Sequence, residues 1–297
     1  MELAKHDLRV VVIGGASWNT MIRVERFPEP GPGRVVPIDW HDAVGSSGAG
    51  KALNLARLGV SVTLATALGD DEDGRRVAAF LTAAGIDLIL ATNAGGTTRH
   101  VNLMDRAGRR LSILLEHRTE LQIDLAAVER AVAAADAVFL GIGHDARHLV
   151  PLIRLHERPI WTDLHSYDGG DSYHQPFIEA ADVVLLSGDR LADPRATVEE
   201  IHRRGKRLVV CTLAERGAIA LDSGGRWHNV QAEPATIVDT NGAGDAYGAG
   251  LLVGELVGFS LDEALVMAAR TAAIAIGSRD LSASDLTLAR VVPNSAH

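Results

Sequence analysis

The feature that most constrains the fold is the regular alternation of short apolar runs with stretches of helical periodicity. Segments such as 75–84 and 125–135 have the helical pattern. The apolar runs are rich in Val, Ile and Leu, and they lie at residues 10–13, 62–66, 137–140, 159–163 and 182–186. Strands that alternate with helices in this way form a mostly parallel sheet with helices on both faces. The sequence therefore predicts an α/β fold.

Two regions interrupt this alternation. Residues 27–44 contain four prolines and two glycines, which excludes a helix there, and residues 98–115 predict a β-hairpin. We expect these extended pieces, within segments of about 16–44 and 97–116, to form a small second sheet. Two interpretations stay open on the sequence alone: a lid over the main domain, or an extension that covers an edge strand.

Composition excludes several classes of protein. The chain of 297 residues is 47% hydrophobic and 23% charged, which are ordinary globular proportions. Its net charge of −9, without a long basic run, argues against a nucleic-acid binder. The single cysteine, Cys211, excludes an internal disulfide framework, and the apolar stretch 264–277 is too short to span a membrane. We expect residues 1–297 to form one cytoplasmic domain that binds neither nucleic acid nor membrane.

The segment 239–245, Asp-Thr-Asn-Gly-Ala-Gly-Asp, carries the strongest chemical signal. It leads directly into a long apolar helical pattern, and its small residues let backbone N–H groups at the helix start approach a ligand closely. Such a helix start attracts anions. A carboxylate in the first turn, here Asp245, can take a proton from a hydroxyl group that attacks a bound phosphoryl group. The pattern predicts a phosphoryl-transfer site.

This segment resembles the C-terminal signature of the ribokinase-like (PfkB) carbohydrate kinases, usually written Asp-Thr-x-Gly-Ala-Gly-Asp. Further similar segments follow in the family's order along nearly the whole chain, at residues 11–30, 45–50, 56–59, 68–71, 85–86 and 212–217. The resemblance implies a ribokinase-like three-layer αβα domain with a mostly parallel central sheet and a small β lid.

The resemblance also implies an ATP-dependent kinase that transfers the γ-phosphoryl group to a hydroxyl of a sugar. Asp245 would then be the general base, with an anion hole formed by Gly242, Ala243 and Gly244. The nucleotide would lie against Thr212, Ala214, Gly217, Asp239, Thr240 and Asn241, and the acceptor against Asn19, Gly45, Ser46, Gly50 and Arg99. Magnesium would neutralise the triphosphate. A dependence on a monovalent cation and a homodimer formed through the lid stay open.

The chain departs from the family's usual pattern at several of these positions. Asn19 replaces an Asp, Ser46 a Gly and Gly50 an Asn, while Ala214 stands where Gly is usual. The family's Asn-x-x-Glu element is replaced by residues 187–190, Ser-Gly-Asp-Arg, which lack the glutamate. No metal ligand is assigned with certainty, and Asp189 is the candidate from this segment.

Lys51 gives residues 45–51 the Gly-x4-Gly-Lys beginning of a P-loop. The next residue is Ala52, so the hydroxyl that would hold magnesium is missing, and no clean buried strand precedes the segment. We therefore expect no P-loop. The default expectation for Lys51 is a solvated position on a helix face, and contact with an anionic substrate group is the alternative.

Two other functions remain as alternatives. A nucleoside kinase of the same fold needs an aromatic ring to stack on the base, for which Trp18 and Trp40 are the candidates. A non-catalytic sugar or nucleotide sensor would keep the fold without the activity, and the altered segment 187–190 motivates that alternative.

Overall fold

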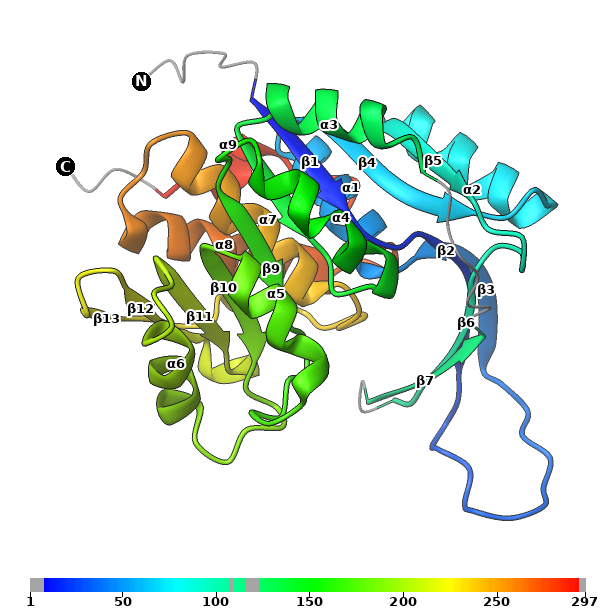
Figure 1. The fold of residues 1–297 in the computed structure, drawn as a ribbon. Coiled ribbons are helices and arrows are strands. Elements are labelled where there is room, and N and C mark those ends of the chain that lie inside the picture. The colour runs from blue at the N-terminus through cyan, green and yellow to red at the C-terminus, as the bar shows by residue number, and fades with distance from the viewer. Residues whose placement is uncertain (1–7, 107–108, 116–122, 294–297) are drawn as a thin grey trace.

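The computed structural model describes residues 8–106, 109–115 and 123–293, and its described part contains two β-sheets (Figure 1). The larger sheet has the order β13-β12-β11-β10-β9-β8-β1-β4-β5 and is parallel except at β12 and β13. Its strands are β1 (Arg9–Ile13), β4 (Ser61–Leu68), β5 (Asp87–Thr92), β8 (Ala137–Leu140), β9 (Ile160–Asp163), β10 (Val183–Ser187), β11 (Leu208–Thr212), β12 (Ala218–Asp222) and β13 (Trp227–Val230).

Helices cover both faces of this sheet, because successive residues of each buried strand point to opposite sides. In β1, Val10 and Val12 pack into one apolar cluster, while Val11 and Ile13 pack into another. The first cluster includes residues of α1 (Ser47–Arg57), α2 (Glu72–Ala83), α7 (Ala243–Leu256), α8 (Leu261–Ile276) and α9 (Leu288–Val291). The second includes residues of α3 (Leu125–Ala134), α4 (His144–Arg154), α5 (Gln175–Ala180) and α6 (Pro194–His202). The predicted three-layer αβα architecture is confirmed.

Local sequence signals predicted these elements close to their observed positions. The expected strand at 10–13 is β1, and the expected strand at 62–66 lies within the longer β4. The acidic cluster before the helix expected at 75–84 includes the N-cap residue of α2, because the Asp71 side chain accepts a hydrogen bond from the Gly74 amide. Carboxylates are favoured at a helix N-terminus, where free N–H groups and the helix dipole carry partial positive charge.

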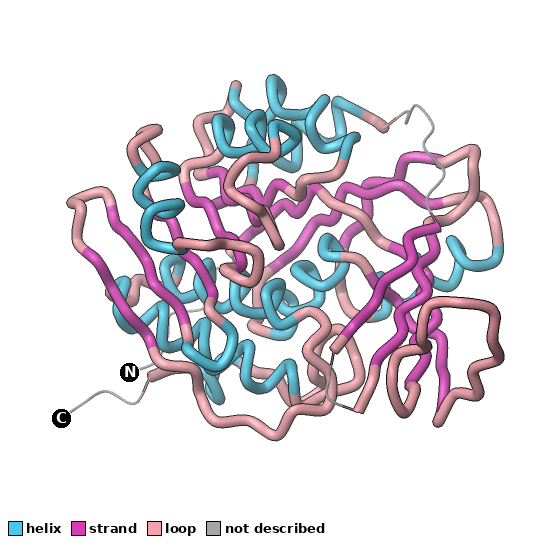
Figure 2. Tube along the Cα trace, turned by 90° about the horizontal axis from the view of Figure 1, so that it is seen from below, coloured by secondary structure: helices cyan, strands magenta, loops and turns pink. Residues whose placement is uncertain are grey.

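The second sheet has the order β3-β2-β6-β7 and stands to one side of the large sheet (Figures 1 and 2). Its strands are β2 (Ser17–Arg23), β3 (Asp39–Gly45), β6 (Arg99–Met104) and β7 (Arg110–Leu115). They come from the two segments in which the sequence predicted a small sheet; residue 116 lies outside the described residues. The hairpin β6–β7 is antiparallel, and β2 pairs with β6 in parallel. That this sheet acts as a lid stays a prediction.

The order of strands reverses beside β1. The chain first builds β4 and β5 on one side of β1, then crosses to β8 on the other side. Ligand sites of open α/β sheets lie at the carboxyl ends of the strands next to such a reversal. Within the described ranges, no helix is both long enough and apolar enough to cross a bilayer.

Candidate active site

The first turn of α7 lies at the carboxyl ends of the central strands and is prepared by the residues before it. Gly242 is the N-cap of α7 and has a left-handed φ of 78°. A Cβ atom there would also come within 3.3 Å of the Leu281 carbonyl oxygen, so glycine is favoured twice. The preceding turn is held by Asp239, whose carboxylate accepts a hydrogen bond of 2.7 Å from the Asn241 amide. The N–H groups of this helix start form a site suited to an anion.

Asp245, in the first turn of α7, does not point into bulk water. It is 8% exposed, and its Oδ1 atom accepts hydrogen bonds of 2.5 Å from the Ser47 hydroxyl and 2.5 Å from Lys51 Nζ. Both donors belong to α1. Lys51 Nζ also donates to Asp163 Oδ2, at the end of β9, over 3.0 Å. Three elements that are distant in the sequence therefore converge on one ion-paired cluster.

This cluster corrects the expectation for Lys51. Its side chain is 2% exposed instead of solvated on a helix face, because two carboxylates from other elements surround its ammonium group. Lys51 lies in the second turn of α1, and α1 follows β3 of the small sheet, so the P-loop arrangement is absent from this segment, as expected. Ser47 was not predicted as a site residue, and for Lys51 contact with a substrate group was only the alternative interpretation. Their spacing of four on one helix face was the one local signal available.

The charges of the cluster stabilise one another. Burial by itself would lower the pKa of Lys51, but the charges of Asp163 and Asp245 outweigh it and raise that pKa. Burial by itself would raise the pKa of Asp163, but His165 and Lys51, with their hydrogen bonds, lower it to about 2. Both groups are therefore held in their charged forms near neutral pH.

In the described part of the chain, one group of side chains has the spacing of metal ligands: Asp163, His165 and Asp245. Two of its carboxylates already contact the Lys51 ammonium group. The group as arranged therefore fits an ammonium ion rather than a divalent cation. Asp189, the candidate from the sequence, is exposed and accepts a hydrogen bond of 2.8 Å from Ser166 instead.

Three of the predicted acceptor-binding residues lie together where the small sheet meets α1. Asn19 is buried and accepts a hydrogen bond of 2.7 Å from the Ser17 hydroxyl, which also contacts the Ser46 hydroxyl at 2.8 Å. A Cβ atom on Gly45 would lie 1.8 Å from Asn19 Nδ2, so only glycine allows this packing. Ser46 has a left-handed φ of 72°, an unusual conformation that is common at functional sites.

The other two predicted acceptor-binding residues adjoin that trio, since the Gly50 amide donates to the Ser46 carbonyl oxygen over 3.0 Å and Arg99 pairs with Trp18 between β6 and β2. Gly50 lies in α1 against Asp245, since a Cβ atom there would be 2.7 Å from Asp245 Oδ2. Arg99 lies on β6, and its guanidinium pairs with Asp73 of α2 over 2.9 Å. Trp18, a candidate stacking residue, carries the Arg76 guanidinium over its ring at 5.7 Å. The second stacking candidate, Trp40, is 65% exposed on β3.

The predicted nucleotide turn follows β11. Thr212 ends that strand, and its carbonyl oxygen accepts a hydrogen bond from the Gly188 amide over 2.8 Å. Ala214 has a left-handed φ of 52°, which explains why glycine is the easier residue at this position. Gly217 has a φ of 82°, and a Cβ atom there would lie 2.0 Å from the Val230 carbonyl oxygen. Asn241, in the turn before α7, accepts a hydrogen bond from Arg110 of the small sheet. Thr240 lies beside it, where its carbonyl oxygen faces the Ala243 amide at 3.4 Å.

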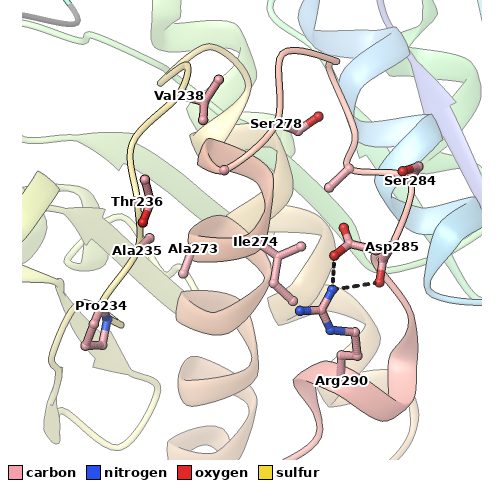
Figure 3. Close-up of a pocket in the computed structure, with 12 residues that line it drawn as sticks. Pro234, Ala235, Thr236, Val238, Ala273, Ile274, Ser278, Ser284, Asp285 and Arg290 are labelled. Atoms are coloured by element: carbon pink, nitrogen blue, oxygen red, sulfur yellow. Dashed lines mark hydrogen bonds and ion pairs between the residues drawn. The ribbon is translucent and has the colours of Figure 1, made fainter.

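A separate hollow of about 500 Å³ lies between the segment 234–238, the end of α8 and the segment 283–290 (Figure 3). Arg290 forms an ion pair with Asp285 at its rim. Its lining contains Val238, one residue before Asp239, but none of the site residues predicted from the sequence. We therefore do not assign it to the reacting groups.

Comparison with known proteins shows the family to which the chain is similar. A sequence profile described as pfkB family carbohydrate kinase matches residues 7–146 and 177–288. The acarbose 7(IV)-phosphotransferase of an Actinoplanes strain is 35% identical over 264 residues, which cover 86% of this chain and 88% of that protein. The fructoselysine 6-kinase of Escherichia coli is 28% identical, with coverage of 75% and 87%.

Solved structures give the same result for the fold. A microbiome-derived acarbose kinase superimposes with a TM-score of 0.86 at 28% identity, covering 97% of this chain and 98% of that one. The ribokinase of Arabidopsis thaliana, solved with ribose and ATP, has a TM-score of 0.78 at 19% identity, with coverage of 98% and 100%. At that identity the likeness concerns the fold alone.

Proposed function

The chain belongs to the pfkB family of carbohydrate kinases, and from this premise we propose that Asp245 is the general base that activates a sugar hydroxyl for attack on the γ-phosphoryl group of ATP. The protein is a phosphotransferase with an alcohol group as acceptor, as the family is. The observation that carries the proposal is the position of Asp245: a buried, ion-paired carboxylate in the first helical turn, beside a backbone site suited to an anion.

The Asp245 carboxylate has one oxygen fixed and one available. Oδ1 accepts from Ser47 and Lys51, whereas no donor of the described residues reaches Oδ2, which lies 2.7 Å from where a Cβ atom on residue 50 would be. In the step we propose, the acceptor hydroxyl gives its proton to Oδ2 while its oxygen forms the new bond to phosphorus. The bond between phosphorus and the ADP oxygen breaks at the same stage, and ADP leaves.

The turn 242–244 supplies the second part of the mechanism. We propose that its backbone N–H groups stabilise the negative charge on the phosphoryl oxygens during transfer, because they are oriented before the reaction begins. The left-handed Gly242 is the residue that starts α7 at this place. Substitution of Gly242 would strain the backbone that presents these groups.

The nucleotide and the metal ion follow from the family. Kinases of this family use ATP and typically magnesium, which when bound neutralises the charge of the triphosphate. We propose Thr212, Ala214 and Gly217 as the nucleotide-binding turn, together with the segment 239–241. Since the described Asp163–His165–Asp245 group fits the Lys51 ammonium, we assign no residue of this chain to the metal ion.

For the acceptor we propose a carbohydrate bound near Asn19, Gly45 and Ser46. Two similar proteins are named for phosphorylating acarbose, so acarbose belongs in the first screen with ribose, fructose, fructoselysine, adenosine and inosine. Turnover with adenosine or inosine alone would replace the sugar-kinase proposal by a nucleoside kinase. Binding of sugars without ADP formation would support the sensor alternative.

The decisive variant is Asp245→Asn, which keeps the shape of the side chain and removes its basicity. We expect ADP formation in the presence of the acceptor to fall by about 10²–10⁴-fold, the usual worth of general-base assistance. Asp193→Asn is the matched control, because Asp193 caps α6 by accepting from the Ala196 amide and asparagine caps helices equally well. Near-normal turnover of Asp245→Asn would show that another group takes the proton.

A further inference from the structure

Lys51 is a buried ammonium group whose three hydrogen-bonding positions are all used. It donates to Ser47 Oγ over 2.6 Å, to Asp163 over 3.0 Å and to Asp245 over 2.5 Å. An ammonium group has three donors and no acceptor, so none is left for solvent or substrate. The ring of Phe139 lies 5.0 Å from Nζ and bounds the site on another side. Such a charge, 2% exposed, is held in one position.

Burying a lysine is costly unless the charge is matched, and here two carboxylates match it. Fold stability alone does not require a charge, because apolar residues of similar volume can replace a buried ion pair without loss. The Lys51 charge lies against the carboxylate that we propose as the base. Its second partner, Asp163, also contacts His165 Nδ1 at 3.4 Å.

Gly50 completes the arrangement from the same helix. An interior glycine destabilises a helix relative to alanine. Here, a Cβ atom at residue 50 would lie 2.7 Å from Asp245 Oδ2 and 3.2 Å from its Cγ atom. The absent side chain therefore leaves room for the carboxylate to lie against α1, within reach of Lys51 and Ser47.

We propose that Lys51 is a positioning residue for phosphoryl transfer: its ammonium group holds the Asp245 carboxylate in one orientation, with Oδ1 hydrogen-bonded and Oδ2 presented to the acceptor, and Gly50 makes the space for this orientation. This inference rests on the role proposed above for Asp245. Lys51 acts through Asp245, Asp163 anchors Lys51 from β9, and Ser47 bridges Lys51 to Asp245.

The test is Lys51→Met, which keeps the length of the side chain and removes its charge. We expect kcat to fall at least tenfold, while KM for ATP changes less than twofold. Without the ammonium, Oδ1 of Asp245 keeps only the Ser47 hydroxyl as a donor, so the carboxylate is no longer fixed in one orientation. The double variant Lys51→Met/Asp245→Asn should be no slower than Asp245→Asn alone, because both changes remove the same function.

Lys206→Met is the matched control. Lys206 is also a buried lysine, 8% exposed, but it donates to the carbonyl oxygens of Glu179 and Ala181, outside the cluster. We expect this variant to keep the wild-type kcat and the wild-type KM for ATP. A merely structural effect of losing a buried lysine would appear in both variants as a lower unfolding temperature.

Gly50→Ala tests the same idea without touching the charge, and it decides the matter if Lys51→Met fails to fold. We expect kcat to drop at least tenfold because the Cβ atom displaces the Asp245 carboxylate from Lys51, and circular dichroism should show that the variant is folded. Wild-type kcat in folded Lys51→Met, or wild-type kcat in Gly50→Ala, would overturn the proposal. A raised KM for ATP at unchanged kcat in Lys51→Met would overturn it too, in favour of phosphate binding by Lys51. An active Asp245→Asn, by contrast, removes the proposed base itself.

Discussion

Gly48→Ala should destabilise the protein, although alanine is the better helix former. Gly48 lies in the first turn of α1, where a Cβ atom would be 2.5 Å from the Gly14 carbonyl carbon and 2.6 Å from the Gly15 oxygen. These are backbone atoms, and they are tied on both sides. The Gly15 oxygen accepts from the Ala49 amide over 3.0 Å, and the Gly14 amide donates to Ala65 in β4 over 3.1 Å. The clash therefore cannot be relieved by turning a side chain.

The expected change in the free energy of unfolding is the difference between two opposing contributions. The gain in helix propensity is about 1 kcal/mol, and overpacking against an anchored backbone costs about 3 kcal/mol. A net loss of about 2 kcal/mol lowers the unfolding temperature of a chain of this length by about 3 °C, from an unfolding entropy of about 2.1 cal/mol/K per residue. Scanning calorimetry on Gly48→Ala measures this. Gly170→Ala is the control, since nothing lies within 4 Å of a Cβ atom there. A Gly48→Ala protein as stable as the wild type would refute the close-packing argument.

Two further predictions concern groups outside the site. His228 bonds Asp222 at 2.9 Å and Asp262 at 2.6 Å; burial would lower its pKa, but these carboxylates raise it. The stability that His228 contributes to the fold is therefore fully present below pH about 6.5, and it is lost as the pH rises through the pKa of His228 in the folded protein. Between pH 6 and 9, the urea concentration at the unfolding midpoint should fall in the wild type and fall less in His228→Gln. An equal fall in both proteins would contradict this prediction. Burial raises the pKa of the Cys211 thiol to about 12, so a thiol reagent should label the native protein only as fast as it unfolds. Rapid labelling in native buffer would show that β11 is exposed.

Much of the fold was predictable because its signals are local. Apolar runs such as 137–140 form strands through the chain's own β-branched and apolar content, and Asp71 caps α2 three residues from its hydrogen-bond partner. The start of this helix was equally visible, because the small residues 242–244 come directly before the first-turn carboxylate of Asp245 in the sequence. Asp245 was therefore singled out before its surroundings were known.

The buried position of Lys51 could not be predicted from local sequence signals. Its partners Asp163 and Asp245 lie 112 and 194 residues further along the chain, so no periodicity or spacing relates them to it. A lysine in an 11-residue helix is solvated by default, and only the meeting of α1, α7 and the end of β9 makes it a buried ion. The same holds for Gly50, whose purpose is visible only against the carboxylate of α7.

The amino-acid sequence by itself determined the kinds of element, their order along the chain and the carboxylate that follows the glycine turn. These depend on backbone preference and on alternation of apolar residues over a few positions. The tertiary structure alone decided the charge environment of that carboxylate, because side chains from distant elements come within hydrogen-bonding distance only when the helices pack on the sheet. Electrostatics in a buried site depends on that packing, since an ion pair shielded from water is far stronger than one in solvent.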